Sequence, residues 1–558
     1  MTDLDALLEQ ARAWVAEDPD EETRAELEQL VGDAAADPDG PAAADLAERF
    51  AGTLQFGTAG LRGPLGAGPM RMNRVVVTRA AAGLAAYLRS AGGGAVVIGY
   101  DARRNSEVFA RDTAAVMTGA GFRALVLPRP LPTPVLAFAI RYLGCVAGVM
   151  VTASHNPPQD NGYKVYLGDG SQIVPPEDAR IAAAIDRVGA LVEVPRGGPA
   201  EVLGEDLLEA YVEAVAGLAT AGPRDVSVVH TALHGVGSDT FARVLRRAGF
   251  AAAEPVTEQA EPDGAFPTVS FPNPEEAGAM DLALARAAEV GADLVLANDP
   301  DADRCAAAVP TPDRGWRMLR GDELGVLLGD LLLRRGLAGV YAASIVSSSM
   351  LGKVAAAHRQ PYAETLTGFK WIARVPGLVY GYEEALGYCV APDLVRDKDG
   401  VSAALLTVEL TAALKAENRT LQDRLDDLAR EHGVHGTDQL SVRVAELRQI
   451  SDAMTRLRSD PPDRLGGLEV TRLDDLSEGS EHLPPTDGLR FTLAEGARVV
   501  ARPSGTEPKL KCYLEAVVPV GPAGLADARA TADRRLASVR EDLAAALGVT
   551  ARVTAPGS

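Results

Sequence analysis

Lysine is scarce in this sequence: only seven of its 55 basic residues are lysine, and the other 48 are arginine. Aspartate and glutamate together number 77, so the formal net charge at pH 7 is −22. This balance argues against a nucleic-acid partner, because a phosphate backbone attracts a basic surface. An enzyme that acted on anionic substrates would therefore have to gather its positive charge at a few chosen positions.

Cysteine is also rare, and its spacing excludes two classes of site. The four cysteines (Cys145, Cys305, Cys389 and Cys512) form no CxxC pair, so they give neither a zinc pattern nor a disulfide framework, and a reducing compartment is expected. The opening residues MTDLDALLEQ are acidic and lack the apolar run of a secretory signal. No apolar stretch is long enough to span a bilayer. These absences predict a cytoplasmic protein without a membrane partner, and they leave the oligomeric state open.

At 558 residues the chain is too long for one core, while 47% apolar and 24% charged residues are typical of a globular protein. Leucines and alanines at helical spacing predict a helical extension over 1–50. Beyond it, apolar strand-like runs alternate with alanine-rich helical patterns, which favours an α/β fold. We expect α/β domains at 51–200, 201–318 and 319–436 and a smaller α+β domain at 437–558.

Individual elements follow from the same patterns. PRGGPAEV at 195–202 is typical of a linker. Helices are expected from about Ser106, over 321–336 and around 403–416. Strands are expected at AVVIGY (95–100), ALVLP (124–128), VAGVMVTA (146–153), VSVVH (226–230), DLVLAN (293–298) and YAASIV (341–346).

The segment VMVTASHNPPQDNGYKVY (149–166) places Ser154 on a loop after a predicted strand. Ligands bind at the carboxyl ends of strands in open α/β sheets. A serine there becomes a nucleophile only with a neighbouring base, metal or preformed phosphoester. The alternative is an ordinary Ser/Asn/Pro turn.

The segment LANDPDADRC (296–305) carries Asp299, Asp301 and Asp303 after another predicted strand. Closely spaced carboxylates suit a hard cation such as Mg²⁺, because they repel one another unless positive charge compensates them. An EF-hand loop is excluded, since its glycine position holds Arg304 and its chelating glutamate position holds Pro310. The alternative is a solvated acidic turn.

The segment ARPSGTEPKLKCYLE (501–515) joins the guanidinium of Arg502 to Ser504, Gly505 and Thr506 in a short loop. Such a loop can hold a phosphate through charged and backbone hydrogen bonds, although it lacks the spacing of a nucleotide P-loop. A plain Pro/Ser/Gly turn is the alternative. Five of the seven lysines, namely Lys164, Lys370, Lys398, Lys509 and Lys511, lie in motif-like loops, where a compact ammonium group could act on an anion.

Together these motifs resemble one family. FGTAGLRG (56–63), TASHNP (152–157), DPDADR (299–304), GYEEALGY (381–388), VRDKDG (395–400) and RPSGTEP (502–508) stand in the order seen in the α-D-phosphohexomutases, which include phosphoglucomutases and phosphomannomutases. The resemblance covers the chain from about residue 50 onward. The details TGFKW, DPDADR and EEALGY resemble the branch that contains bacterial phosphomannomutase-like proteins and vertebrate phosphopentomutase-type enzymes.

The resemblance implies three similar α/β domains and a smaller C-terminal domain around a central cleft. It also implies an intramolecular phosphotransferase that interconverts hexose 1-phosphate and hexose 6-phosphate. The cofactors would be Mg²⁺ and a sugar 1,6-bisphosphate, and the partner a small phosphosugar.

Residue by residue, Ser154 resembles the phosphoserine, with a phosphate oxygen beside a metal held by Asp299, Asp301 and Asp303. His155, Arg62 and Lys164 would support the transfer, and Lys398 would act as general base or acid. The substrate-binding candidates are Arg304, Thr367, Gly368, Lys370, Glu383, Arg502, Ser504, Gly505 and Thr506.

One departure bears on specificity. Many hexomutases carry a serine where this chain has Ala385, so one hydroxyl that could contact the sugar is missing. The sequence does not decide between hexose and pentose phosphates; a hexose phosphate is the first candidate, and a phosphopentomutase that converts ribose or deoxyribose 1-phosphate is the second. A non-catalytic sugar-phosphate binding protein would predict damage to the serine, aspartates or lysines, all of which are intact. A phosphatase or a signalling phosphoprotein would be recognised by net release of phosphate.

Overall fold

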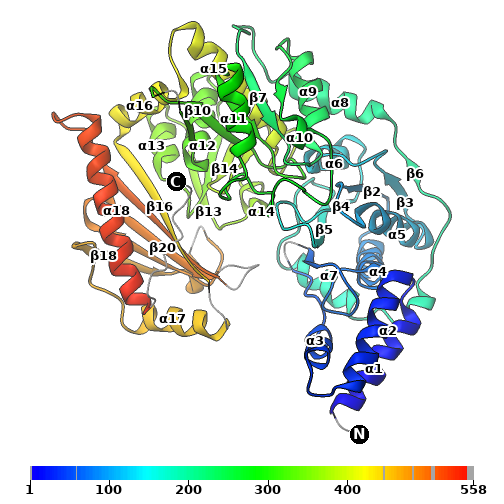
Figure 1. Cartoon of the computed structure of the whole chain (residues 1–558). Coiled ribbons are helices and arrows are strands. Elements are labelled where there is room, and N and C mark those ends of the chain that lie inside the picture. Colours follow the sequence, from blue (N-terminus) through cyan, green and yellow to red (C-terminus); the bar gives the residue numbers. More distant parts are fainter. Residues whose placement is uncertain are drawn as a thin grey trace. The chain divides into compact units, whose positions relative to one another are not determined.

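The computed structural model describes residues 3–57, 60–313, 315–443, 447–480, 483–503 and 509–548. The chain forms two compact units: Met1–Arg317 with Ala391–Glu409, and Met318–Val390 with Leu410–Ser558. Figure 1 labels many of the elements of both. Three mixed sheets flanked by helices and one antiparallel sheet confirm the predicted α/β class with a smaller α+β domain. The domain boundaries stay a prediction. Among the described residues, no helix is long and apolar enough to cross a membrane.

The first unit opens with three helices, as predicted for residues 1–50: α1 (Asp3–Glu17), α2 (Glu21–Ala36) and α3 (Pro41–Arg49). The Asp20 side chain caps α2 by accepting a hydrogen bond from the backbone of Glu22. Leu27 and Leu46 are buried in a cluster that also contains Val75 of the following domain. The helices therefore pack on their own chain.

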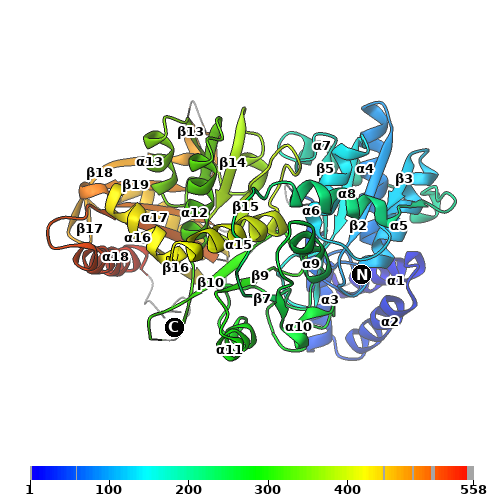
Figure 2. The same ribbon diagram turned by 90° about the horizontal axis from the view of Figure 1, so that it is seen from above.

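The first sheet has the strand order β1–β5–β4–β2–β3–β6, with β1 (Leu61–Pro64), β5 (Asp160–Leu167), β4 (Ala147–Val151), β2 (Ala95–Tyr100), β3 (Arg123–Val126) and β6 (Glu201–Val202). Its helices are α4 (Arg74–Ser90), α5 (Ser106–Gly119), α6 (Thr133–Tyr142) and α7 (Glu177–Ile185). Figure 2 shows α5 beside β2 and β3. On the opposite face, Ile140 of α6 lies against Gly148 of β4. The strands predicted at 95–100, 124–128 and 146–153 are confirmed.

The segment at 195–202 is more than the predicted linker. Glu201 and Val202 pair in parallel with β3 as an edge strand. The amide of Gly197 also donates to the carbonyl of Ala115 in α5. The open edge of β3 offers unpaired backbone groups that this segment satisfies.

The second sheet has the order β11–β10–β9–β7–β8, with β11 (Trp316–Met318), β10 (Ala306–Pro310), β9 (Leu294–Ala297), β7 (Val228–Thr231) and β8 (Glu254–Pro255). Its helices are α8 (Glu205–Ala216), α9 (Gly237–Arg247), α10 (Thr257–Ala260) and α11 (Asp281–Val290). Strands β7 and β9 match the predictions at 226–230 and 293–298. Because β9 pairs with β10 antiparallel, a tight loop over residues 298–305 joins them.

The third sheet, in the second unit, has the order β13–β12–β14–β15, with β13 (Tyr362–Thr365), β12 (Val340–Ser344), β14 (Leu378–Glu383) and β15 (Gly387–Cys389). Its helices are α12 (Gly321–Arg334), α13 (Met350–Ala357), α14 (Phe369–Ile372) and α16 (Leu421–His432), and α15 (Gly400–Ala416) precedes α16. Gly325 of α12 has no room for a side chain, since a Cβ there would lie 2.4 Å from the ring of Tyr382. This glycine lets α12 lie close on the sheet.

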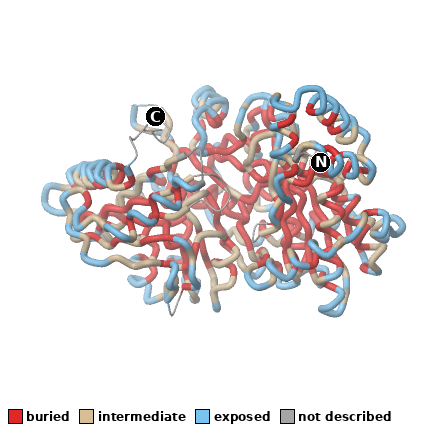
Figure 3. Tube along the Cα trace, turned by 90° about the horizontal axis from the view of Figure 1, so that it is seen from below, coloured by how far each residue is buried: buried red, intermediate tan, exposed pale blue. Residues whose placement is uncertain are grey.

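The fourth sheet is antiparallel throughout, with the order β16–β21–β20–β19–β18–β17: β16 (Val434–Arg443), β21 (Lys509–Val518), β20 (Arg498–Pro503), β19 (Leu489–Leu493), β18 (Leu468–Asp475) and β17 (Arg464–Leu465). Helices α17 (Leu447–Ser459) and α18 (Leu525–Leu547) belong to the same part of the chain. Short 3₁₀ turns lie at Leu191–Glu193, Leu476–Glu478 and Ala494–Gly496. In Figure 3 the buried stretches of the chain lie in the interior and the exposed stretches lie along the outside.

Candidate active site

The loop that carries Ser154 joins β4 to β5 in the first sheet. The amide of Thr152 donates to the carbonyl of Gly162 over 3.1 Å, which continues the pairing of the two strands. A Cβ on Gly162 would lie 2.5 Å from the carbonyl oxygen of Thr152, so this close approach requires glycine. The buried apolar strand β4 and the glycine of β5 thus fix both ends of the loop.

Ser154 is buried and has a left-handed backbone, with φ of 53°. This conformation costs a residue other than glycine about 1 kcal/mol, so the surroundings must hold it. Its Oγ atom donates to Oδ2 of Asp299 over 2.9 Å and lies 3.4 Å from Nδ1 of His155. The serine predicted as the phosphorylated residue therefore meets the predicted metal ligands directly.

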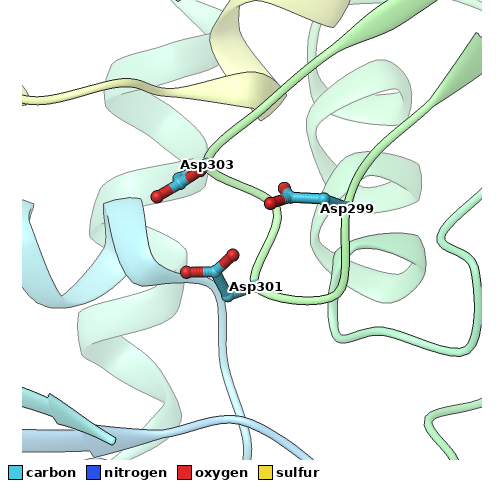
Figure 4. Close-up of side chains that lie close together, drawn as sticks. All are labelled: Asp299, Asp301 and Asp303. Atoms are coloured by element: carbon cyan, nitrogen blue, oxygen red, sulfur yellow. The ribbon is translucent and has the colours of Figure 1, made fainter. Parts of the chain in front are cut away.

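Asp299, Asp301 and Asp303 lie on the loop between β9 and β10, and all three are fully buried. One oxygen from each carboxylate lies within 4.8 Å of the others. Figure 4 shows the three side chains gathered around a common space. The solvated acidic turn is thereby excluded as an interpretation of this segment.

These carboxylates fit a divalent metal ion. Among the described residues, Oδ1 of Asp301 and Oδ1 of Asp303 are buried without a hydrogen-bond partner. Buried polar atoms without partners are costly, and an ion would complete them. Clustered carboxylate oxygens are the ligands that Mg²⁺ prefers.

Basic side chains surround the three aspartates. The sequence suggested this, because an acidic protein must gather its positive charge at a few positions and most of its few lysines lie in motif-like loops. Lys164 on β5 donates to Oδ2 of Asp301 over 2.6 Å and to Oδ2 of Asp303 over 2.9 Å. Nζ of Lys398 lies 3.3 Å from Oδ2 of Asp303, and Nε of Arg304 lies 3.9 Å from Oδ1 of the same residue. Arg62 on β1 donates to Oδ1 of Asn156 in the Ser154 loop over 3.1 Å.

The charges in this cluster shift the pKa of each carboxyl group. Burial, with the repulsion of Asp301 and Asp303, raises the pKa of Asp299 well above its usual value. Burial acts in the same sense on Asp303, but Lys164, Lys398 and Arg304 outweigh it and lower the pKa of Asp303. Burial and the charge of Asp303 act to raise the pKa of Asp301, but Lys164 is the main group that outweighs them, so this pKa is lowered as well.

His155 has a pKa well below its usual value because it is desolvated and lies near Arg304 and Arg62. The imidazole is therefore neutral at pH 7. A neutral ring beside Ser154 can accept or donate one hydrogen bond without adding charge to the site.

The loop that carries Lys398 is held by its neighbour Asp397. Oδ2 of Asp397 accepts hydrogen bonds from the hydroxyl of Tyr166 over 2.8 Å and from Nε2 of Gln172 over 2.6 Å. Tyr166 belongs to β5, the strand that also carries Lys164. The first unit thus brings together Ser154, His155, Arg62, Lys164, Lys398, Arg304 and the three aspartates.

The remaining predicted residues belong to the second unit. Thr367 and Gly368 lie between β13 and α14, Lys370 lies in α14, and Glu383 ends β14. Both β13 and β14 pair in parallel with β12, so their carboxyl ends lie at one edge of the third sheet. The sheet therefore places Thr367 and Glu383 on either side of β12.

Arg502 lies on β20, and the buried Leu366 shares a cluster with Val500 of the same strand. Ser504, Gly505 and Thr506 lie outside the described residues. The phosphate-binding role of Arg502 and of these three residues stays a prediction.

Sequence reasoning missed three residues that shape the first-unit site. Thr133 donates from its hydroxyl to Oδ2 of Asp301 over 2.7 Å. Asp101 and Arg103 follow β2 and contact the Ser154 loop. For Asp101 and Arg103 the available signal was their position directly after a predicted strand, the feature that pointed to Ser154 and Asp299.

Comparison with known proteins gives a consistent result over most of the chain. Four family models match, described as phosphoglucomutase/phosphomannomutase alpha/beta/alpha domain I (residues 53–191), domain II (209–314), domain III (320–432) and C-terminal domain (440–532). The four matches follow one another along the chain without overlap.

Similar curated proteins carry different sugar names. A probable phosphomannomutase of Haemophilus influenzae is 49% identical over 455 residues, which are 80% of this chain and 93% of that protein. A phosphopentomutase of Mus musculus is 34% identical over 577 residues, covering 93% of this chain and 92% of that protein. A phosphoglucomutase of Staphylococcus haemolyticus is 36% identical over 499 residues, covering 83% and 90%.

Among solved structures, a putative phosphomannomutase from Thermus thermophilus matches with a TM-score of 0.69 and 26% identity. The match covers 87% of this chain and 99% of that one. The sequence and fold similarities therefore extend over the same set of domains.

Proposed function

Because the chain belongs to the phosphoglucomutase/phosphomannomutase family, and is thus a sugar-phosphate mutase and an isomerase, we propose that it interconverts hexose 1-phosphate and hexose 6-phosphate through a phosphoserine at Ser154. The intermediate is a hexose 1,6-bisphosphate. The observation that carries the proposal is the buried contact of 2.9 Å between Oγ of Ser154 and Asp299 in a ring of basic residues.

In the proposed reaction, the bond between phosphorus and Oγ of phospho-Ser154 breaks, and a bond from phosphorus to the free hydroxyl oxygen of the sugar phosphate forms. Lys398, in its neutral amine form, accepts the proton of that hydroxyl, and Oγ of Ser154 leaves as an alkoxide. The bisphosphate then presents its other phosphate, which returns to Oγ of Ser154 while Lys398 gives a proton to the departing sugar oxygen. Atoms and charge balance over the cycle, and no water is consumed.

The chain's own residues supply positioning and charge. Lys164 and Arg62 lie beside the serine loop, where their positive charge can neutralise a transferring phosphoryl group. A Mg²⁺ ion held by Asp299, Asp301 and Asp303 would stabilise the charge on the phosphoryl oxygens. Arg304 adds a further positive charge, because its Nε atom lies beside the carboxylates of Asp299 and Asp303.

We further propose that the second unit reads the sugar and its second phosphate. Thr367, Gly368, Lys370 and Glu383 lie at or beyond the carboxyl ends of β13 and β14, the edge where α/β sheets bind ligands. Arg502 and the loop after it would hold the phosphate that is not reacting.

A phosphopentomutase is the second candidate. Two relatives support it: the phosphopentomutase of Mus musculus, at 34% sequence identity, and a probable phosphoribomutase of Schizosaccharomyces pombe, at 36%. Both matches cover at least 90% of this chain. Because this chain has Ala385 where many hexomutases have a serine, it also lacks a hydroxyl that those enzymes place near the sugar. The higher identity of the phosphomannomutase relative supports the hexose substrate.

The test is a direct assay of four substrates with the purified full chain. The 1-phosphates of glucose, mannose, ribose and deoxyribose are incubated separately with Mg²⁺ and a trace of glucose 1,6-bisphosphate, and the products are followed by ³¹P NMR. We expect the hexose phosphates to be isomerised fastest and S154A to be inactive. Faster turnover of the pentose phosphates would favour the second candidate, and net release of phosphate would indicate a phosphatase.

A further inference from the structure

The buried guanidinium of Arg103 holds the Ser154 loop by its carbonyl groups. Nη2 of Arg103 donates to the carbonyl oxygens of Ser154 and Asn156, each over 2.5 Å. Nη1 donates to the carbonyl oxygens of Pro157 over 2.7 Å and Asp160 over 3.2 Å. One side chain therefore satisfies four carbonyl groups of the loop that carries the serine.

Arg103 is itself fixed from two directions. Its side chain is fully buried, and its Nε atom lies 3.4 Å from Oδ2 of Asp101. The guanidinium carbon lies 4.8 Å from the ring centre of Phe266. Gly264 has no room for a Cβ, which would lie 2.6 Å from the carbonyl oxygen of Ala102, so the segment before Phe266 packs closely on the Arg103 backbone.

Asp101 is also linked to the backbone amide of Ser154, through the side chain of Thr152. Its Oδ2 atom accepts a hydrogen bond from the Thr152 hydroxyl over 2.6 Å. The same hydroxyl oxygen accepts a hydrogen bond from the backbone amide of Ser154 over 2.9 Å. Asp101 therefore reaches the amide of Ser154 through Thr152 and its carbonyl through Arg103.

This arrangement explains how a left-handed serine persists in the loop. The φ angle of 53° at Ser154 is strained and must be held by its surroundings. The hydrogen bonds from Ser154 to the Thr152 hydroxyl and from Arg103 to the Ser154 carbonyl hold both of its peptide groups. The four hydrogen bonds from Nη1 and Nη2 of Arg103 all go to carbonyl oxygens of this loop. Arg103 therefore acts on the backbone of the loop and is distinct from Arg62 and Lys164, whose charges lie near the reacting group.

We propose that Arg103, fixed by Asp101, is a positioning residue that aims Oγ of Ser154 for phosphoryl transfer. In-line transfer depends on placing the phosphorylated oxygen to within a fraction of an ångström. A planar fork with several donors can satisfy the loop carbonyls together, whereas the point charge of a lysine cannot. The inference rests on the proposed phosphoserine at Ser154.

The experiment compares wild type, R103K and a matched control, R74K. Arg74 also forms a bidentate ion pair in the first unit. Its Nε and Nη2 atoms donate to the carboxylate of the buried Asp112 over 2.7 and 2.9 Å, away from the Ser154 loop. For each protein, kcat and KM are measured together with the thermal midpoint and the ³¹P signal of the phosphoserine.

For R103K we expect kcat to fall about 100-fold and the phosphoserine signal to shift, with KM within about threefold of wild type. The control R74K should lose thermal stability without a comparable loss of kcat. A second variant, T152V, removes the hydroxyl that accepts the hydrogen bond from the Ser154 amide and leaves Arg103 in place. Its kcat should fall about fivefold to tenfold.

The outcomes distinguish the positioning role of Arg103 from the proposed function itself. A wild-type protein without a phosphoserine signal overturns the proposed function. With that signal present, the positioning role is overturned if R103K and T152V keep wild-type kcat and ³¹P shift, or if R74K loses as much kcat as R103K.

Discussion

The ammonium group of Lys164 lies 2.6 Å from Oδ2 of Asp301, and both side chains are buried. The same group lies 2.9 Å from Oδ2 of Asp303. Burial lowers the pKa of Lys164, but the two carboxylates outweigh it, so that its pKa is raised and the side chain is charged at neutral pH. Lys164 thus supplies positive charge to the aspartate cluster from within the protein.

We expect K164M to make the protein depend on Mg²⁺ for its stability. Removing one partner of a buried ion pair costs about 3–5 kcal/mol, because the remaining carboxylates are left uncompensated. A metal ion bound by the same carboxylates would restore part of that loss. The thermal midpoint measured in EDTA and in Mg²⁺ should therefore differ more for K164M than for wild type, and turnover should fall at least about 100-fold.

The control for this comparison is K353M, because Lys353 is exposed and lies outside the aspartate cluster. It should show the wild-type midpoint in both buffers. Equal midpoints for K164M and wild type in EDTA, with the same gain from Mg²⁺, would contradict the role of Lys164 as an internal counter-charge.

A second prediction concerns Ala385, which lies in the turn between β14 and β15, two residues after Glu383. A385S adds a hydroxyl next to the proposed sugar-reading edge. One neutral hydrogen bond contributes about 1 kcal/mol, so the ratio of kcat/KM for hexose over pentose phosphate should rise about fivefold. Coupled assays with glucose 1-phosphate and ribose 1-phosphate measure this ratio.

A serine placed elsewhere in the second unit controls for the substitution itself. A357S, at the exposed end of α13, should leave the ratio unchanged. If A385S leaves the ratio unchanged as well, or lowers it, the turn does not read the sugar hydroxyls.

The local part of the site could be predicted from the sequence. Ser154 and the three aspartates each follow an apolar run that forms a buried strand, and the structure places both loops at strand ends. The short spacing of the aspartates was enough to infer a cation site, since their carboxylates cannot lie far apart. The strands at 95–100 and 293–298 were predicted for the same reason, because their apolar pattern is local.

The residue patterns alone do not reveal the long-range contacts, although the family resemblance placed Lys164 near the transferring group. Arg103 meets the Ser154 carbonyl across 51 residues, and Lys164 meets Asp301 across 137. Such contacts depend on which strands are neighbours in the sheet, which no periodicity reveals. The edge strand at Glu201–Val202 was missed in the same way, because its two residues pair only where β3 offers a free edge.

A third prediction follows from Asp322 at the start of α12, which is buried in the second unit. Its Oδ1 atom accepts hydrogen bonds from the amide of Ser348 over 2.6 Å and from the hydroxyl of Tyr382 over 3.0 Å. Burial, reinforced by the nearby charges of Glu384 and Glu515, raises the pKa of Asp322 to about 7. In Glu515 the charge of Arg498 outweighs burial and lowers the pKa to about 2, so Glu515 stays ionised between pH 5 and pH 8.

The raised pKa of Asp322 makes the folded state less stable as the pH rises. The folded protein binds this proton more tightly than the unfolded chain, whose aspartate titrates near 3.8, so the stabilisation is complete below pH 3.8 and is lost as the pH passes through about 7. The loss is on the order of a few kcal/mol, because each tenfold difference in proton affinity between the two states corresponds to about 1.4 kcal/mol.

In D322N the neutral amide keeps the accepting oxygen at all pH values. The thermal midpoint of D322N relative to wild type should therefore rise from pH 5 to pH 8, whereas D460N, at an exposed position, should follow the wild-type curve. A midpoint for D322N that falls between pH 5 and pH 8 as steeply as that of wild type would show that Asp322 is ionised throughout.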